Sequence, residues 1–239
     1  MRRVLLISNS TLYGSGYLDH AEGEIRDFLG KAKRVVFVPF AAFERGRYTV
    51  QTRTRLHAMG FELTSVHDVS NPQRILAEGD AVFVGGGNTF RLLKGLYDSH
   101  LLEPIRTAVE EGLPYIGSSA GAIVAGPSLR TTKDLPVVQP PSFASLGIVE
   151  FQISPHYLDP DPNSTHMGET QEERILQFLE ENEAPVVGLR EGGMVRIENN
   201  KITLKGSAGA RIFRRGQPPV EMSPVSELAE VLHTPAGVA

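Results

Sequence analysis

The sequence predicts an α/β fold in three layers, a doubly wound and mostly parallel sheet with helices on both faces. Short runs made almost entirely of apolar residues are typical of strands that are buried on both faces. Longer segments with the three- and four-residue spacing of amphipathic helices lie between these runs, and this alternation predicts parallel strands joined by helices. No linker or internal repeat divides the 239 residues. We therefore expect a single α/β domain over residues 1–239.

The predicted parallel strands cover residues 4–7, 35–38, 81–84, 115–117 and 186–189. The predicted helices cover residues 17–29, 50–59, 101–111 and 170–179. In the last helix, Ile175, Phe178 and Leu179 fall on one face, which indicates the side that packs on the sheet.

The C-terminal part of the chain has a different pattern. Strand-like residues 194–197 and 201–204 flank Glu198-Asn199-Asn200, which is typical of a β-hairpin. A further strand is expected over residues 210–213 and a short helix over residues 226–232. We interpret these strands as antiparallel additions at the edge of the sheet.

Composition excludes several classes of protein. The net charge of −4 gives no electrostatic reason to expect nucleic acid, whose binding depends on a basic face, so we expect no nucleic-acid partner. The chain has no cysteine, which excludes disulfides, thiolate zinc sites and a cysteine nucleophile. The first apolar run is too short for a signal peptide or a membrane span, and no other stretch is long enough. We expect a soluble, cytoplasmic protein without a membrane partner.

A candidate nucleophile lies where the fourth predicted strand ends. Gly117-Ser118-Ser119-Ala120-Gly121 matches G-x-S-x-G between a buried strand and small, helix-compatible residues. A nucleophile elbow needs small residues two before and two after the serine, because the chain bends sharply there. Ser119 is therefore the predicted nucleophile, and Ser118 is interpreted as structural. The alternative is a glycine-rich helix start that only packs closely on a strand.

A second glycine cluster, Gly85-Gly86-Gly87, follows the predicted strand 81–84. The carboxyl ends of neighbouring parallel strands meet where ligands usually bind. The backbone amides of Gly87 and Ala120 are thus candidates for an oxyanion hole. A plain turn with Asn88 or Thr89 as helix N-cap is an equally good interpretation. A phosphate-binding loop is disfavoured, because the cluster lacks the residues of a P-loop or of G-x-G-x-x-G.

A serine nucleophile needs an adjacent base, and the chain has seven histidines. A strand is expected in Phe151-Gln152-Ile153-Ser154-Pro155, where the proline stops it, so His156 stands at a predicted strand end. It is the preferred base, and a purely structural role is the alternative. His166 is the second candidate and a candidate for lining the substrate pocket.

The base needs an acid that orients it, and two carboxylates are candidates. Glu191 follows the predicted strand 186–189 and precedes two glycines, whereas Asp134 lies in a polar loop. An ordinary surface carboxylate is the alternative for each. With Glu191 the chain order is serine, histidine, acid, which differs from the order serine, acid, histidine of α/β-hydrolases.

Several segments together resemble the peptidase E family, the α-aspartyl dipeptidases among the serine peptidases. The matching segments are Ser8-Asn9-Ser10-Thr11, Gly85-Gly86-Gly87-Asn88-Thr89-Phe90, Gly117-Ser118-Ser119-Ala120-Gly121, Thr131-Thr132-Lys133-Asp134-Leu135-Pro136, Pro155-His156-Tyr157, Gly168-Glu169-Thr170 and Glu191-Gly192. They occur in the same order and span most of the chain.

The resemblance implies a fold like that of the class I glutamine amidotransferases (flavodoxin-like), with serine in place of cysteine. It implies hydrolysis of dipeptides that begin with aspartate, with Ser119 as nucleophile and His156 as base. The acid of the family falls on Glu191 and Asp134, of which we prefer Glu191 for orienting the base. A homodimer, a small peptide as substrate, and no metal or other cofactor are also implied.

The sequence departs from the family pattern at Gln171, where an arginine often follows Gly168-Glu169-Thr170. If that arginine recognises the substrate aspartate, another cation must do so here. Arg130 and Arg174 are candidates, because a guanidinium binds a carboxylate in two places. The alternative is that each of these two arginines is an ordinary surface residue that does not bind the substrate. Three other functions stay open: a cyanophycinase-like hydrolase of other aspartyl compounds, a non-catalytic binding module on an amidotransferase-like scaffold, and a nucleotide-binding protein.

Overall fold

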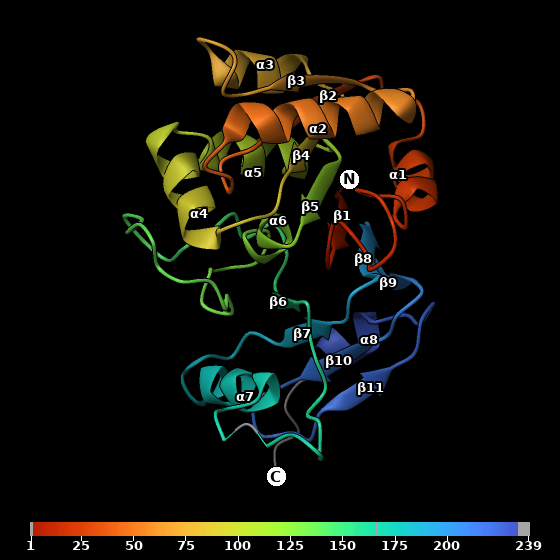
Figure 1. The fold of residues 1–239 in the computed structure, drawn as a ribbon, viewed down its shortest axis with the longest axis vertical. Coiled ribbons are helices and arrows are strands. Elements are labelled where there is room, and N and C mark those ends of the chain that lie inside the picture. The colour runs from red at the N-terminus through yellow and green to blue at the C-terminus, as the bar shows by residue number, and fades with distance from the viewer. Residues whose placement is uncertain (1, 166, 234–239) are drawn as a thin grey trace.

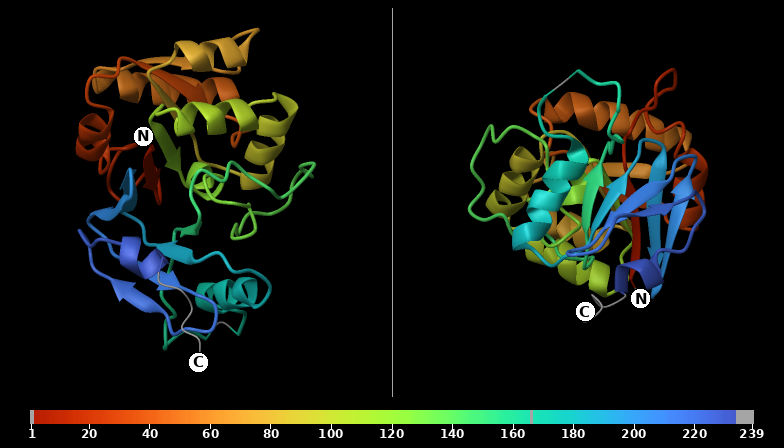
Figure 2. Two further views of the ribbon diagram at one scale, coloured as in Figure 1. Left: turned by 180° about the vertical axis from the view of Figure 1, so that it is seen from behind. Right: turned by 90° about the horizontal axis from the view of Figure 1, so that it is seen from below.

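A computed structural model describes residues 2–165 and 167–233. The chain forms two sheets, which lie one above the other along the long axis of the molecule (Figure 1). From behind, the second sheet again lies below the first (Figure 2, left). The larger sheet has seven strands in the order β3-β2-β4-β5-β1-β8-β9, and the smaller has four in the order β11-β10-β7-β6.

The seven-stranded sheet has a parallel centre and an antiparallel edge. Its parallel strands are β1 (Arg3–Ile7), β2 (Arg34–Val38), β3 (Glu62–Ser65), β4 (Ala81–Val84) and β5 (Tyr115–Ser118). β1 pairs with β5 in parallel, with Ile7 opposite Ser118, and with β8 (Gly193–Glu198) in antiparallel orientation. β8 continues into the edge strand β9 (Lys201–Gly206). The predicted hairpin at this edge is therefore confirmed.

Helices cover both faces of this sheet. Ile25 of α1 (Glu22–Leu29) and Leu56 of α2 (Arg45–Ala58) pack in one cluster with the side chains of one sheet face. Leu76 of α3 (Pro72–Glu78), Leu92 of α4 (Thr89–Asp98) and Ile105 of α5 (Leu102–Glu110) belong to the cluster on the other face. Successive side chains of a strand belong to the two clusters in turn, because they point to opposite faces of the sheet. The predicted three-layer α/β fold is confirmed.

The second sheet was not expected. It contains β6 (Gln152–Pro155), β7 (Val186–Leu189), β10 (Ala210–Phe213) and β11 (Val220–Met222). The prediction that residues 186–189 join the large parallel sheet is wrong, because β7 pairs in parallel only with β6. The prediction that residues 210–213 extend the edge of that sheet is also wrong, because β10 pairs with β7 and β11.

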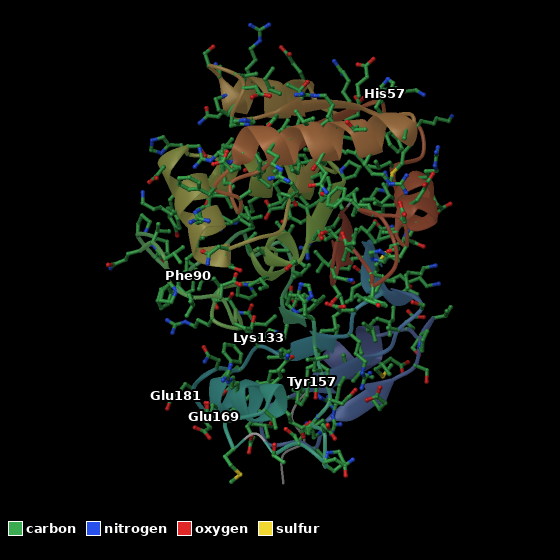
Figure 3. All side chains as sticks on the ribbon, viewed as in Figure 1. His57, Phe90, Lys133, Tyr157, Glu169 and Glu181 are labelled. Carbon is green, nitrogen blue, oxygen red and sulfur yellow. The ribbon has the colours of Figure 1, made fainter. Side chains whose placement is uncertain are left out.

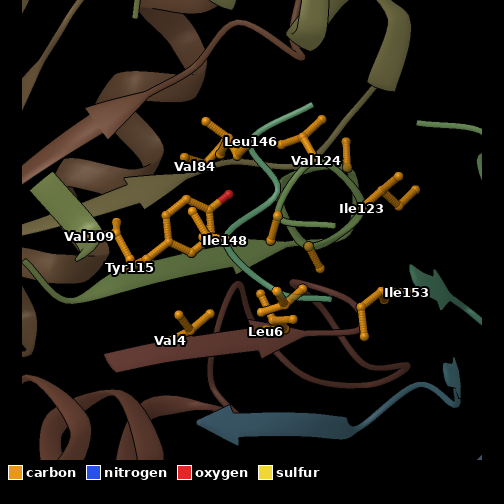
Figure 4. Packing of buried hydrophobic residues seen from close by; sticks show 14 of the residues in the cluster. Val4, Leu6, Val84, Val109, Tyr115, Ile123, Val124, Leu146, Ile148 and Ile153 are labelled. Carbon is orange, nitrogen blue, oxygen red and sulfur yellow. The ribbon is translucent and has the colours of Figure 1, made fainter. Parts of the chain in front are cut away.

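A helix packs on the second sheet and a hydrophobic core joins the two sheets. Ile175 and Leu179 of α7 (Gln171–Glu181) pack against Phe213 of β10. Ile153 of β6 belongs to the same buried cluster as Val4 of β1, and Figure 4 shows both among the packed side chains of this cluster. The last element is α8 (Ala229–His233). Over the described part of the chain, no helix is long and apolar enough to cross a membrane.

Candidate active site

Ser119 lies on a sharp turn between β5 and the four-residue helix α6 (Ala120–Ile123). The backbone of Ser119 has a φ of 51° and a ψ of −109°, a conformation that a residue with a side chain rarely adopts. A Cβ at Gly117 would lie 2.4 Å from the carbonyl oxygen of Gly121, and one at Gly121 would lie 2.1 Å from that of Val84. Only glycine fits at both positions, so the local sequence forms the tight elbow that G-x-S-x-G predicts.

His156 faces Ser119 from the other sheet. It follows the last residue of β6 and has a φ of 52°, so its backbone also lies in the left-handed region. Its Nε2 atom lies 3.0 Å from Oγ of Ser119. The two strained residues therefore meet through their side chains, one from each sheet, and strain of this kind clusters at active sites.

Glu191 lies on the far side of the imidazole. Its Oε1 atom is 2.7 Å from Nδ1 of His156. Glu191 follows β7, which pairs with β6, so the ends of two neighbouring parallel strands bring the two side chains together. The side chains of His156 and Glu191 are 40% and 48% exposed, which leaves the pair open to solvent on one side.

The glycine turn after β4 runs beside Ser119. A Cβ at Gly86 would lie 3.0 Å from Cβ of Ser119, so the two backbones are in close contact. The amide of Gly86 donates to the hydroxyl of Tyr48, at 2.9 Å. The amides of Gly87 and Ala120 have no acceptor among the hydrogen bonds of the described residues. Two free N–H groups thus flank the nucleophile candidate. The predicted helix N-cap is also present, because Oδ1 of Asn88 accepts from the amide of Arg91.

A pocket of about 310 Å³ opens at this site. Ser119, His156 and Gly87 line it together with side chains from the loop after β1 and from α2, namely Ser10, Thr11, Tyr17, Tyr48 and Gln51. Burial raises the pKa of the phenols of Tyr17 and Tyr48, so both stay neutral donors and acceptors. The volume lies near the lower end of the range for ligand pockets, ~300–1,000 Å³, and suits a small substrate.

Asp134 lies elsewhere in the site. Its Oδ2 atom accepts hydrogen bonds of 2.6 Å from both the amide and the hydroxyl of Thr89, at the start of α4. Thr132 also donates to the hydroxyl of Thr89, at 3.0 Å. Asp134 therefore fastens the segment 131–135 to the glycine turn, and of the two candidate acids only Glu191 contacts the imidazole.

Lys133 was missed by the sequence analysis, because an isolated lysine in a polar loop is usually solvated. Its Nζ atom donates to the carbonyl oxygens of Pro155 and His156, at 2.9 and 3.1 Å. Figure 3 shows it between the large sheet and α7. The residue is exposed overall, but its ammonium lies among protein atoms, and this desolvation lowers the pKa of Lys133 to about 8. Asp134 and Glu191 oppose that shift and Arg174 adds to it.

Neither of the two predicted substrate-binding arginines lines the pocket of about 310 Å³ at Ser119. Both line a smaller cavity of about 80 Å³, together with Lys133 and Gln171. The guanidinium of Arg130 lies 5.3 Å from the ring centre of Phe143, and Arg174 forms an exposed ion pair with Glu169. The side chain of Gln171 accepts a hydrogen bond from the amide of Leu158. The remaining candidate, His166, lies outside the described residues.

Known proteins resemble this chain over nearly its whole length. "Peptidase E" of Streptomyces coelicolor is 53% identical over 96% of this chain and 94% of that protein. "Probable alpha-aspartyl dipeptidase" of Drosophila melanogaster is 45% identical over 97% of this chain and 98% of that protein. A solved peptidase from an acI-B1 actinobacterium has the same fold, with a TM-score of 0.72 at 15% identity, covering 95% of this chain and 96% of that one.

The comparisons confirm the resemblance to peptidase E that the motifs indicate. The model of the family described as Peptidase family S51 matches residues 4–205, which include Ser119, His156 and Glu191. The chain therefore belongs to peptidase family S51, and it is a peptidase.

Proposed function

We propose that this peptidase hydrolyses dipeptides with an N-terminal aspartate, through Ser119, His156 and Glu191. The observation that carries the proposal is the unbroken chain of contacts from Oγ of Ser119 to Nε2 of His156, and from Nδ1 to Glu191. The substrate class is supported by the printed name of the Drosophila relative and by the small pocket beside Ser119.

Acylation follows from this geometry. Nε2 of His156 removes the hydroxyl proton of Ser119 as Oγ attacks the scissile carbonyl carbon. Glu191 holds the imidazole in the tautomer with a proton on Nδ1 and stabilises the imidazolium that forms. His156 then transfers its Nε2 proton to the leaving amine, and the peptide C–N bond breaks. The aspartyl group remains as an ester on Oγ.

The free amides of Gly87 and Ala120 are the donors proposed for the oxyanion. Charge develops on the carbonyl oxygen during the attack, and N–H groups already aimed at that position stabilise it without reorganisation. The helix α6 has only four residues, so we assign the effect to the two local N–H groups. Water then attacks the ester with His156 as base, which releases aspartate and restores the hydroxyl of Ser119.

Recognition of the substrate carboxylate needs positive charge near the acyl group. Lys133, Arg130 and Arg174 supply three cations around the small neighbouring cavity. Lys133 is the one with contacts to the backbone of His156. We propose that these cations favour an acidic side chain in the substrate, and that Asp134 contributes by holding the loop that carries Lys133.

A panel of dipeptides that differ only in the first residue tests this proposal. We expect turnover of Asp-Leu by the wild-type protein, much weaker turnover of Ala-Leu and Lys-Leu, and none by Ser119→Ala. Ser118→Ala is the matched control, because Oγ of Ser118 is buried without a hydrogen-bond partner among the described residues. Turnover by Ser119→Ala at the wild-type rate would disprove the mechanism.

The same assay separates the other candidate activities. Preference for a β-aspartyl-arginine polymer over every dipeptide would identify a cyanophycinase-like hydrolase. Failure of a serine-directed phosphonate to modify Ser119, together with measurable binding of Asp-Leu, would identify a non-catalytic binding module. Neither result is expected, because the Ser119 hydroxyl already lies 3.0 Å from a base.

A further inference from the structure

The end of β1 contacts the backbones of both Ser119 and His156. The carbonyl oxygen of Ile7 accepts from the amide of Ser119 at 2.9 Å. The next residue, Ser8, accepts from the amide of His156 through its Oγ, also at 2.9 Å. The same hydroxyl donates to the carbonyl oxygen of Leu189 at 2.8 Å. Ile7, the last residue of β1, and Ser8, which follows it, therefore hold Ser119 after β5 of the large sheet and His156 after β6 of the second sheet.

The following residue, Asn9, holds the turn that contains Glu191. Its Oδ1 atom accepts from the amide of Gly192 at 2.8 Å, and its Nδ2 atom donates to the carbonyl oxygen of Thr11 at 2.9 Å. Gly192 has a φ of 83° and directly follows Glu191. Ile7, Ser8 and Asn9 thus form three consecutive attachments, one beside each member of the proposed triad.

These attachments are well suited to fix geometry. Ser8 is fully buried and Asn9 is nearly so, and a buried hydrogen bond is both stronger and more directional than an exposed one. β1 is an interior strand, bonded to β5 on one side and to β8 on the other, so the segment that follows it is anchored on both sides of the strand. The Ser8 hydroxyl uses its single proton on Leu189 and a lone pair on His156, so its orientation is determined.

The attachment matters most at His156, whose backbone is strained. A positive φ at a residue with a side chain is strained and persists only where the surroundings enforce it. The amide of His156 is held by Ser8, and its carbonyl oxygen by Lys133. Without the hydroxyl of Ser8, the amide would lose its acceptor, and the imidazole could move away from Ser119.

We propose that Ser8 and Asn9 are positioning residues of the active site, which align the base and the acid of the second sheet with the nucleophile of the first. This inference rests on the proposed function of Ser119, His156 and Glu191. Neither Ser8 nor Asn9 needs to touch the substrate for this role. A misplacement of about 1 Å at the base can lower the rate about 100-fold, so the contribution of Ser8 is measurable in kcat.

The test compares Ser8→Ala with Ser118→Ala. Both serines are fully buried at the ends of neighbouring strands, but Oγ of Ser118 has no hydrogen-bond partner within the described residues. Active sites are first counted by titration with a serine-directed phosphonate, so that unfolded protein does not enter kcat. The measurements are kcat and KM for Asp-Leu and the second-order rate constant of phosphonate inactivation.

We expect Ser8→Ala to lower kcat and the inactivation rate about 10- to 100-fold per active site, with KM within about twofold. Ser118→Ala is expected to keep both rates. A purely structural role of Ser8 would lower the fraction of folded protein but not the rates per active site, and that result would overturn the inference.

Two further variants keep the test decisive. If Ser8→Ala does not fold, Ser8→Cys is measured instead, because a thiol has nearly the same shape but is a weak acceptor. The same fall in rates is expected, and wild-type rates would overturn the inference. Asn9→Leu removes the acceptor of the Gly192 amide and is expected to lower kcat in the same way. Failure of the proposed function itself looks different: the wild-type protein would then not hydrolyse Asp-Leu, or Ser119→Ala would.

Discussion

Glu191 lies 2.7 Å from the imidazole of His156, although 35 residues separate the two in the chain. They meet because β6 and β7 are parallel neighbours. His156 is the first residue after β6, and Glu191 is the second residue after β7. Asp134, the other candidate acid, instead holds Thr89 at the start of α4. The two carboxylates therefore have different physical roles, and substitutions can separate them.

Replacing Glu191 with glutamine should mainly affect the chemical step. The amide can no longer stabilise an imidazolium, and it allows the other tautomer of His156. We expect kcat for Asp-Leu to fall about 100-fold or more, short of the ~10⁴-fold known for a buried triad acid, because water reaches this half-exposed pair. Steady-state kinetics from pH 5 to 9 measure the effect. Asp134→Asn keeps an acceptor oxygen for Thr89, and its kcat should fall less than about tenfold. A larger fall in kcat for Asp134→Asn than for Glu191→Gln would make Asp134 the acid that supports His156.

Replacing Asp134 with alanine should mainly affect stability. The helix α4 would lose a carboxylate that accepts from the amide and the hydroxyl of Thr89 in its first turn. We expect the free energy of unfolding to fall by about 1–2 kcal/mol, the usual effect of removing such a cap. Urea unfolding measures it. Asp98→Ala is the matched control at the other end of α4, where the carboxylate makes only an exposed ion pair with Lys94. An equal loss in both variants would contradict the capping role.

Gly121→Ala should destabilise the elbow. The new Cβ would lie 2.1 Å from the carbonyl oxygen of Val84, so either β4 or α6 must shift. We expect a loss of about 3 kcal/mol or more in the free energy of unfolding, and a fall in kcat, because Ser119 moves with the turn. Gly23→Ala is the control, since a Cβ there meets nothing within 4 Å. Gly23 is an exposed position of α1, where alanine should raise the free energy of unfolding by up to about 1 kcal/mol. Equal stability of the two variants would show that the elbow tolerates a side chain.

Lys133 should make stability depend on pH in the alkaline range. Its pKa is about 8 in the folded protein, against ~10.4 for a lysine in an unfolded chain. Below pH 8 both states are protonated, and the cost of desolvating the ammonium is fully present. Between these two pKa values the unfolded chain binds more protons, so the free energy of unfolding rises with pH.

The matching variant is Lys133→Met, which cannot titrate. Urea unfolding of both proteins at several pH values gives the difference between their free energies of unfolding. We expect the free energy of unfolding of the wild-type protein to rise relative to that of the variant as the pH increases from about 8 to ~10.4. Parallel curves across that range would show that Lys133 has an ordinary pKa in the folded state.

The sequence predicted the elbow well because the signal is local. The small residues around Ser119 and the buried strand before it lie within a few positions, and steric limits on that turn leave few other solutions. The strand ends that carry His156 and Glu191 were also recognised, from Pro155 and from the glycines after Glu191. Parallel strands present their carboxyl ends on one side, so three strand ends were enough to suggest a shared site.

The division into two sheets could not be predicted. Residues 186–189 are apolar on both faces. Such a pattern indicates a buried strand, but it does not indicate which other strands this strand pairs with. The bounds of β3 are hard to predict for the opposite reason. Glu62 and Thr64 interrupt its apolar residues, so the pattern of this short edge strand differs little from that of a loop. The helix expected over residues 17–29 begins only at Glu22, after turns that contain Gly14 and Gly16. The roles of Lys133 and Asp134 depend on partners more than 20 residues away, which no local pattern contains.

Ser119 and His156, the proposed nucleophile and base, lie 37 positions apart in the chain, so they are synthesised at different times. A growing chain that has emerged only as far as α6 already contains every residue of the elbow, but it does not yet contain His156. N-terminal segments generally fold first during synthesis, so the proposed mechanism predicts no peptide hydrolysis until β6 docks. The onset of hydrolysis during refolding therefore reports the last assembly step, not the formation of the first sheet.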